Sequence, residues 1–283
     1  MLISIASGKG GTGKTALALL LAIVHGPITL LDCDVEEPNC HLFLNPEWQN
    51  PSQKVTVTIP YVNLPLCNRC GVCATACLFN ALVVSTESIL LFDELCHSCH
   101  GCILACPKDA ITEESKVIGN LIQGVSKNHP HITLVNGTLK VGTPSAVPLI
   151  KKMRKDYARP IGDILLDCPP GTACSMVAAV KDNDFCILVA EPNPFGKHDL
   201  ELAMKITQML NVPTGVVINK GDSGIGDQSI KALCENRNIP ILGIIPHSLS
   251  FAKQYATGQI PDEFKHIACT IWENLAKQRS LVQ

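Results

Sequence analysis

The sequence predicts an α/β fold, a three-layer sandwich around a mostly parallel sheet, interrupted by a small α+β insert. Short apolar strands alternate with helical segments over most of the chain, as in parallel sheets that helices cover on both faces. Residues 55–114 break this alternation, because they hold eight of the fifteen cysteines and only short β-like segments. We therefore expect one domain from residues 1–54 and 115–283, and an inserted domain from residues 55–114.

A glycine-rich turn follows the first predicted strand. Leu2–Ala6 has the pattern of a buried strand, Lys14–Val24 is an apolar helical run, and Ser7–Thr15 between them reads SGKGGTGKT. This turn satisfies the phosphate-loop pattern G-x-x-x-x-G-K-[ST], in which backbone N–H groups bind phosphate, the lysine reaches the β/γ oxygens and the hydroxyl binds Mg²⁺. The expected nucleotide contacts are Gly8, Gly10, Gly11, Thr12, Gly13, Lys14, Thr15 and Ala16, with Thr15 also the Mg²⁺ ligand. The sequence thus predicts a Rossmann-like P-loop NTPase domain, and a glycine-rich turn without a ligand is the alternative.

The remaining elements of this domain are expected from the periodicity of apolar residues. The predicted strands cover residues 28–31, 161–167, 185–191, 214–219 and 241–245. The predicted helices cover residues 146–157, 175–181, 197–210 and 225–237, and a last one begins near residue 262. Residues 114–143 are expected to form short strands and turns, because glycines interrupt them repeatedly.

The insert contains two cysteine runs that repeat with a period of 29 residues. Each run has the spacing Cys-x₂-Cys-x₂-Cys-x₃-Cys of bacterial ferredoxins, in which the fourth cysteine binds the other cluster. One [4Fe–4S] cluster is therefore assigned to Cys67, Cys70, Cys73 and Cys106, and the other to Cys96, Cys99, Cys102 and Cys77. Zinc is the alternative, although a zinc ribbon needs only paired Cys-x₂-Cys motifs. Between the runs, residues 82–84 and 89–92 predict a hairpin, so the insert is expected to resemble a small bacterial ferredoxin.

Composition limits the function further. The net charge is −2 and no basic block is present, so we expect no nucleic-acid partner. No apolar run reaches about 18 residues and the first residues enter a strand directly, so we expect a cytoplasmic protein without membrane association. In such a setting, fifteen cysteines favour metal ligation over disulfides.

A second lysine in the phosphate loop indicates a particular class of P-loop protein. With Lys9, the loop reads GKGGTGKT and resembles the deviant phosphate loop of the MinD/ParA/Mrp ATPases, in which the early lysine reaches the nucleotide of the partner subunit across a dimer. Ala16 departs from the pattern, because many relatives have a second threonine there. Residues 191–200 resemble a segment of MinD-superfamily ATPases that carry an inserted ferredoxin domain. The resemblance implies an ATP-dependent homodimer.

The same resemblance implies roles for residues elsewhere. Residues 32–39 resemble switch I, which makes Asp34 the residue that orients or activates the attacking water. Residues 164–172 resemble the Walker B and switch II segment, which places Asp167 near Mg²⁺. Asn219 and Pro246 are expected beside adenine, although Asp222 three residues after Asn219 would suit guanine. The expected catalytic residues are Lys9, Lys14, Asp34 and Asp167.

We therefore predict an iron–sulfur protein that binds and hydrolyses ATP. Its expected cofactors are ATP/ADP, Mg²⁺ and two [4Fe–4S] clusters, and its partner is an unidentified redox or metal-cofactor protein. Nucleotide state is expected to control electron transfer from the clusters to that partner. The first alternative is an ATPase that assembles or carries metal clusters. The second is a spatial organiser like MinD, but the apolar stripe from Phe264 to Leu275 is expected to pack in the core instead of on a membrane.

Overall fold

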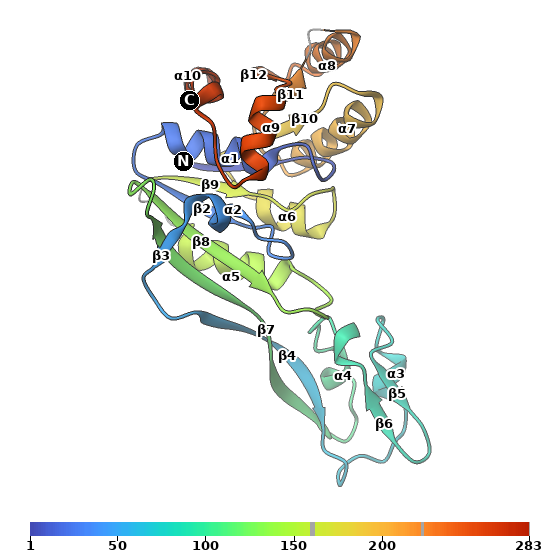
Figure 1. Cartoon of the computed structure of the whole chain (residues 1–283). Helices are drawn as coiled ribbons and strands as arrows, with labels where there is room; N and C mark the ends of the chain where they lie inside the picture. Colours follow the sequence, from blue (N-terminus) through green and yellow to red (C-terminus); the bar gives the residue numbers. More distant parts are fainter. Residues whose placement is uncertain (159–161, 222–223, 283) are drawn as a thin grey trace.

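The computed structural model describes residues 1–158, 162–221 and 224–282, which form a helix-covered sheet with a long projection (Figure 1). The central strands are parallel and lie side by side in the order β12, β11, β10, β1, β9, β2, β8. In chain order they are β1 (Leu2–Ala6), β2 (Ile28–Asp32), β8 (Ile132–Leu139), β9 (Asp163–Asp167), β10 (Phe185–Ala190), β11 (Thr214–Gly221) and β12 (Ile241–Pro246). The predicted α/β fold with a mostly parallel sheet is confirmed.

Helices cover both faces of this sheet, and each face has its own apolar core. One core includes residues of α1 (Lys14–Val24), α2 (Cys40–Leu44), α9 (Leu249–Ala256) and α10 (Lys265–Val282). The other includes residues of α5 (Val147–Tyr157), α6 (Cys174–Val180), α7 (Pro194–Met209) and α8 (Ile225–Asn236). Successive strand residues alternate between the two cores, as Leu30 and Leu31 do on β2, because neighbouring side chains on a strand point to opposite faces.

A long antiparallel ribbon leaves the sheet beyond β8 and corrects one expectation. β7 (Ile111–Ser126) pairs with β8, with β3 (Pro46–Trp48) and with β4 (Gln53–Val62). The expected turn at Gly142 is present, but the expectation of only short strands over 114–143 is wrong, because β7 alone has 16 residues. Two of the glycines taken as turn signals lie inside β7, where a Cβ on Gly119 would come within 2.5 Å of the Thr138 carbonyl oxygen, and one on Gly124 within 2.6 Å of that of Glu47. These glycines allow close approach of strands, which is the other use of glycine in sheets.

The cysteine-rich segment lies at the far end of the β4–β7 ribbon (Figure 1). It contains α3 (Val72–Thr75), β5 (Leu82–Val84), β6 (Ile89–Leu91), the 3-10 turn η1 (Asp93–Leu95) and α4 (Gly101–Leu104). β5 and β6 form the predicted antiparallel hairpin. β4 and β7 run without interruption across residues 54 and 114, so the ribbon joins the two expected domains, and their division stays a prediction.

The internal repeat is visible in the backbone of this segment. Positive φ angles recur 29 residues apart at Arg69 and Ser98 and at Asn80 and Asp109. Because α3 and α4 are offset by the same 29 residues, the two halves repeat one local structure. A small apolar core that includes Leu82 and Ile111 joins them.

The end of the chain packs against the sheet. Phe264, in the 3-10 turn η2 (Asp262–Phe264), and Ala268, Ile271 and Leu275 of α10 are buried in the core that contains α1, so the predicted core packing of this stripe is confirmed. In the described ranges, the structure has no helix long and apolar enough to cross a membrane. β9 begins at Asp163 in the structure. Its predicted first residue, Ile161, lies outside the described residues.

Candidate functional site

The phosphate loop connects β1 to α1, as the sequence predicts. Gly13 precedes α1 with φ at 91°, and a Cβ there would overlap the Asn219 side chain, so this position requires glycine. Asn219 Nδ2 donates to the Thr12 carbonyl oxygen at 2.7 Å and ties the loop to the end of β11. Because Gly13 has no side chain that caps the helix, the first N–H groups of α1 are available to an anionic ligand.

Two aspartates stand behind this loop at the ends of neighbouring strands. Asp32 ends β2, Asp167 ends β9, and the two residues are directly opposite in the parallel pairing. Both are fully buried. Thr15 Oγ1 donates to Asp167 Oδ2 at 2.6 Å, so the predicted Mg²⁺ ligand and the predicted Walker B carboxylate lie together.

Burial is the main cause of the pKa shifts of the three aspartates at this site, Asp32, Asp34 and Asp167. Burial, and after it the neighbouring charge of Asp167, raises the pKa of Asp32 to about 8. Burial also raises the pKa of Asp167 to about 6, against the hydrogen bond from Thr15 and the charge of Lys14. Asp34 is half-buried, and desolvation raises its pKa to about 6 while Lys14 opposes that change. Each of these carboxyl groups is therefore harder to ionise here than in water, and a bound cation would favour its ionised form.

Lys9 of the phosphate loop forms an ion pair within its own chain. Its Nζ is 3.3 Å from Glu191 Oε2, and Lys220 pairs with the other oxygen of the same carboxylate. Burial works against ionisation of Glu191, but the hydrogen bonds and charges of Lys220 and Lys9 hold its pKa below the ordinary value. The expected role of Lys9 across a dimer stays a prediction.

A cavity of about 220 Å³ opens beside the loop, where adenine is expected. Ala16, Asn219 and Pro246 line it, so the structure brings these three predicted residues together. Phe251 and Tyr255 of α9 also line it, and sequence reasoning missed this helix. The available signal was Ser248, whose Oγ accepts a hydrogen bond from the Phe251 N–H at 3.1 Å and caps α9. Asp222, the residue that would suit guanine, lies outside the described residues.

The eight cysteines of the insert surround two cavities. Cys67, Cys70, Cys73 and Cys106 line one of them. Cys77, Cys96, Cys99 and Cys102 line the other. This is the crossed grouping that the ferredoxin spacing predicts, with the fourth cysteine of each run beside the other run.

The spacing of these thiols bears on which metal group they fit. Thiolates on a single tetrahedral zinc at 2.3 Å stand about 3.8 Å apart. Among the described residues, no three of the eight insert thiols lie within 4.8 Å of one another. Backbone N–H groups point at the sulfurs of Cys77 and Cys106, from Ala81 at 3.3 Å and Ala110 at 3.4 Å. Such N–H···S bonds stabilise thiolates on either metal group, whereas the wide spacing of the thiols fits iron–sulfur clusters better than single zinc ions.

Another cavity, of about 590 Å³, lies between the nucleotide side and the cysteine side. Glu36, two residues after Asp34, lines it, and so does Ser175 near the start of α6. Cys96 and His97 line it from the insert, and Lys116 of β7 lines it from the ribbon. Lys116 also pairs with Asp93 of η1 at 2.8 Å, which anchors the insert to the ribbon.

A phosphate loop between β1 and α1, with carboxylates at the ends of β2 and β9, defines a P-loop nucleotide-binding protein. Residues 3–261 match the family described as the CobQ/CobB/MinD/ParA nucleotide binding domain. The chain belongs to this family, whose MinD/ParA-type P-loop ATPase fold supports ATPase activity in general.

Similar proteins agree with this assignment. The uncharacterized protein MJ0579 of Methanocaldococcus jannaschii is 28% identical, over 81% of this chain and 83% of the relative. The uncharacterized protein MJ0578 of the same organism is 30% identical, over 78% of each chain. The solved structure of the septum site-determining protein MinD from Pyrococcus horikoshii, complexed with Mg-ADP, has the same fold with a TM-score of 0.58 at 18% identity, over 98% of this chain and 94% of that one. None of these comparisons bears on the predicted ferredoxin-like insert, which stays a prediction.

Proposed function

We propose that this chain binds and hydrolyses ATP and that its nucleotide state is coupled to two [4Fe–4S] clusters, for electron transfer to a partner. The cavity of about 590 Å³ carries this proposal. Its lining combines Glu36, from the segment that resembles switch I, with Ser175, just after the segment that resembles switch II, and with Cys96 of the insert. A rearrangement of either switch segment would therefore alter the surroundings of a cluster ligand.

The nucleotide half of the proposal rests on the loop and the carboxylates. Lys14 and the loop N–H groups would hold the phosphates, and Thr15 would hold Mg²⁺ with Asp167 behind it. Bound Mg²⁺ would supply charge compensation on the β and γ oxygens. Asp34 is close enough to Lys14 to feel its charge, so it lies on the phosphate side of the site. There it would orient the attacking water or accept its proton.

The insert would supply the redox half. Its two groups of four cysteines would hold the clusters, which supply one-electron transfer when bound. The chain's own contribution is to set the environment of the thiolates. The N–H groups of Ala81 and Ala110 stabilise negative charge on Cys77 and Cys106, while the exposure of Cys70 and Cys99 admits water. Both effects alter cluster potentials.

The homodimer in this proposal requires Lys9 to reach the partner's nucleotide. Lys9 would then leave Glu191, and Lys220 would remain to pair with that carboxylate. The cost of moving Lys9 is therefore small, because Glu191 keeps a cationic partner. This arrangement supports a Lys9 that is bound in the monomer and released in an ATP-dependent dimer.

A second function, assembly or transfer of clusters, is favoured by one specific observation. Cys70 and Cys99 are exposed, so an acceptor protein would have access to a ligand of each cluster. Incubation with an apo-acceptor separates the two functions. An electron-transfer protein keeps its iron after the reaction, whereas a carrier loses iron to the acceptor in an ATP-dependent way.

Coupling is tested by the affinity for ATP in two redox states. The affinity of the anaerobic full-length protein is measured by equilibrium dialysis before and after reduction. Coupling free energies are typically about 1–3 kcal/mol, which corresponds to roughly a 5- to 150-fold change in affinity. Equal affinities in both redox states would contradict the proposed coupling, and the carrier function would then be preferred.

A further inference from the structure

Two carboxylate oxygens behind the phosphate loop are buried without a partner. Asp32 Oδ2 accepts hydrogen bonds from the N–H groups of Asn39 and Cys40, both at 3.0 Å. Asp167 Oδ2 accepts the hydroxyl of Thr15. The remaining oxygen of each aspartate, Oδ1, has no hydrogen-bond partner in the described part of the chain, although both residues are fully buried. Leaving such an oxygen unsatisfied is costly, so these atoms are ready to accept a ligand.

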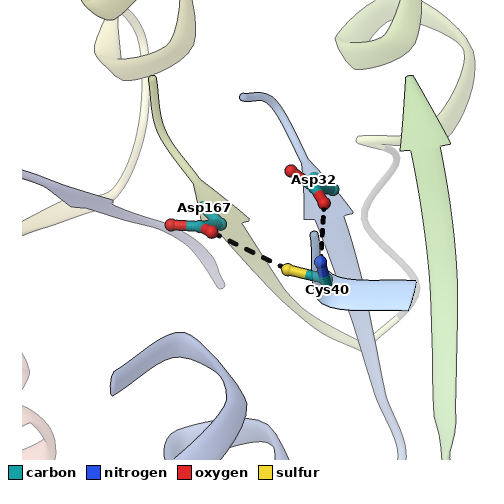
Figure 2. Close-up of side chains that lie close together, drawn as sticks. All are labelled: Asp32, Cys40 and Asp167. Carbon is teal, nitrogen blue, oxygen red and sulfur yellow. Dashed lines mark hydrogen bonds between the residues drawn. The ribbon is translucent and has the colours of Figure 1, made fainter. Parts of the chain in front are cut away.

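A thiol faces the same two carboxylates. Cys40 begins α2, is fully buried, and directs Sγ toward Asp167 Oδ2 at 3.7 Å (Figure 2). One oxygen of Asp32, one oxygen of Asp167 and Cys40 Sγ all lie within 4.8 Å of one another. The oxygens that face Cys40 are the hydrogen-bonded Oδ2 atoms, and the Oδ1 atoms point to the other side of the two carboxylates (Figure 2). No other group of three or more histidine, cysteine or acidic side chains in the described ranges converges this closely. The neighbouring segment is also held in place, because two N–H donors join α2 to Asp32.

The chemistry of these three donors selects a class of ion. Two adjacent buried carboxylates repel each other unless a proton or a cation compensates them. Mg²⁺ takes oxygen ligands and keeps several waters, so a buried thiol contributes little to its binding. Thiolate ligands favour Zn²⁺, Fe²⁺ and Co²⁺ over hard cations. We propose that Asp32, Cys40 and Asp167 form a buried site for a thiophilic first-row divalent cation, which binds without nucleotide.

This site shares Asp167 with the Mg²⁺ position of the proposed ATPase but differs from it in the other ligands. That Mg²⁺ would be held by Thr15 and phosphate oxygens and needs a nucleotide, whereas the buried site needs the Cys40 thiol. It is also independent of the insert, because none of its ligands comes from residues 55–114. A cation bound there would join the ends of β2 and β9 to α2, at the two boundaries of the segment that resembles switch I. Metal occupancy would therefore restrain this segment.

Cobalt is the probe for the test, because a Co²⁺–thiolate bond gives a charge-transfer band in the near ultraviolet. The nucleotide-free full-length protein, purified anaerobically with its bound iron, is titrated with Co²⁺ and separately with Mg²⁺. Cys40→Ser is compared with Cys186→Ser, since Cys186 is equally buried but lies in β10 away from the carboxylates. Cys40→Ser should lose one equivalent of bound Co²⁺, or at least about tenfold in affinity, together with the charge-transfer band. Its weak Mg²⁺ binding should not change, and Cys186→Ser should match the wild type.

A second variant covers the case in which Cys40→Ser does not fold. Asp32→Asn keeps an oxygen for the N–H groups of Asn39 and Cys40 but removes a charged ligand, and it should also lose one Co²⁺ equivalent. Iron content is recorded for each variant, so loss of the buried site is distinguished from absence of the proposed clusters. Identical Co²⁺ stoichiometry and affinity in the wild type and in the folded variants would overturn the proposal. Equal dependence of Mg²⁺ and Co²⁺ on Cys40 would also overturn it, because the thiol would then select no ion.

Discussion

The nucleotide side and the cysteine insert are built in opposite ways. The nucleotide side assembles residues from Gly11 to Pro246, which meet only because parallel strands end at the same edge of the sheet. The insert places all its predicted ligands between residues 67 and 106, on two copies of one local structure. One site is therefore a product of the whole fold and the other of a short repeat.

This difference has consequences for stability. Two extensive apolar cores hold the nucleotide side, one on each face of the sheet. The insert has a small core around Leu82 and Ile111 that also includes the predicted ligands Cys73 and Cys102. So small a core stabilises little by itself, and metal binding contributes folding free energy in such segments. We expect the insert to depend on its clusters and the sheet domain to fold without them.

The largest effect is expected from substitution of Lys14, which should reduce ATP hydrolysis without changing the iron content. Lys14→Ala removes the buried charge that would face the β/γ oxygens, so ATP hydrolysis should fall by at least about 10²-fold. Iron content should stay unchanged, because the cysteine-rich segment lies at the far end of the β4–β7 ribbon from the sheet (Figure 1). Steady-state phosphate release and iron analysis check this, with Lys54→Ala, an exposed lysine on β4, as the control. Loss of iron in Lys14→Ala would show that the two regions do not fold independently.

The converse test changes the insert. The wild-type protein should contain about eight iron atoms per chain, and Cys70→Ser should retain about four. ATP binding should be nearly unchanged, because the sheet domain does not need the insert to close. Cys269→Ser, another exposed cysteine but on α10, should keep all the iron. Stoichiometric zinc in place of iron would refute the cluster assignment.

Substitution of Lys9 tests whether a second subunit contributes a residue to the nucleotide site. If Lys9 acts across a dimer, Lys9→Ala should reduce hydrolysis by about 10²–10³-fold, the usual effect of removing one group that stabilises transition-state charge. ATP-dependent dimerisation should weaken, while each monomer still binds nucleotide. Lys220→Ala is the matched control, because it also removes a cation from Glu191. Sedimentation with ATP decides: an unchanged dimer with unchanged turnover would make Lys9 an intrachain partner of Glu191 only.

A smaller effect is expected from pH, and it should arise on the nucleotide side. The pKa of Asp32 is raised from 3.8 to about 8, mainly by burial. The folded state therefore favours the protonated acid, and this contribution to stability is present below about pH 4 and lost as pH rises through about 8. Without added divalent cations, the Tm of the wild type should fall between about pH 4 and 8, and Asp32→Asn should be flatter by a few degrees, about 2–4 °C per kcal/mol. Parallel Tm profiles for the two proteins would contradict this origin of the pH dependence.

The sequence predicts the local features of both regions well. The strand, loop and helix around residues 2–24 and the hairpin in the insert are determined by neighbouring residues, so periodicity and spacing are sufficient. The crossed grouping of the cysteines follows from the same kind of local spacing. The β4–β7 ribbon was missed, because a glycine such as Gly119 has the same sequence signal in a turn and in a close strand pair.

Features that depend on strand order were not predictable. Asp32 and Asp167 are 135 positions apart and become neighbours only because β2 and β9 are adjacent in the sheet. Cys40 joins them through α2, a helix of five residues that is too short for a periodic signal. Phe251 and Tyr255 of α9 line the cavity beside the phosphate loop, but this placement depends on how the chain returns over the loop after β12. Local patterns in a single sequence do not predict these long-range placements.

The proposed coupling is measured most sensitively by an EPR-monitored redox titration of the full-length protein, with and without a non-hydrolysable ATP analogue. Switch segments rearrange on γ-phosphate contacts, and here Glu36 of the segment that resembles switch I and Ser175, just after the segment that resembles switch II, share a cavity with Cys96. A coupling free energy of about 1–3 kcal/mol corresponds to a shift of roughly 40–130 mV in a one-electron potential. We predict a shift of this size in at least the cluster that includes Cys96. Superimposable curves for both clusters would contradict a coupling between nucleotide state and the insert.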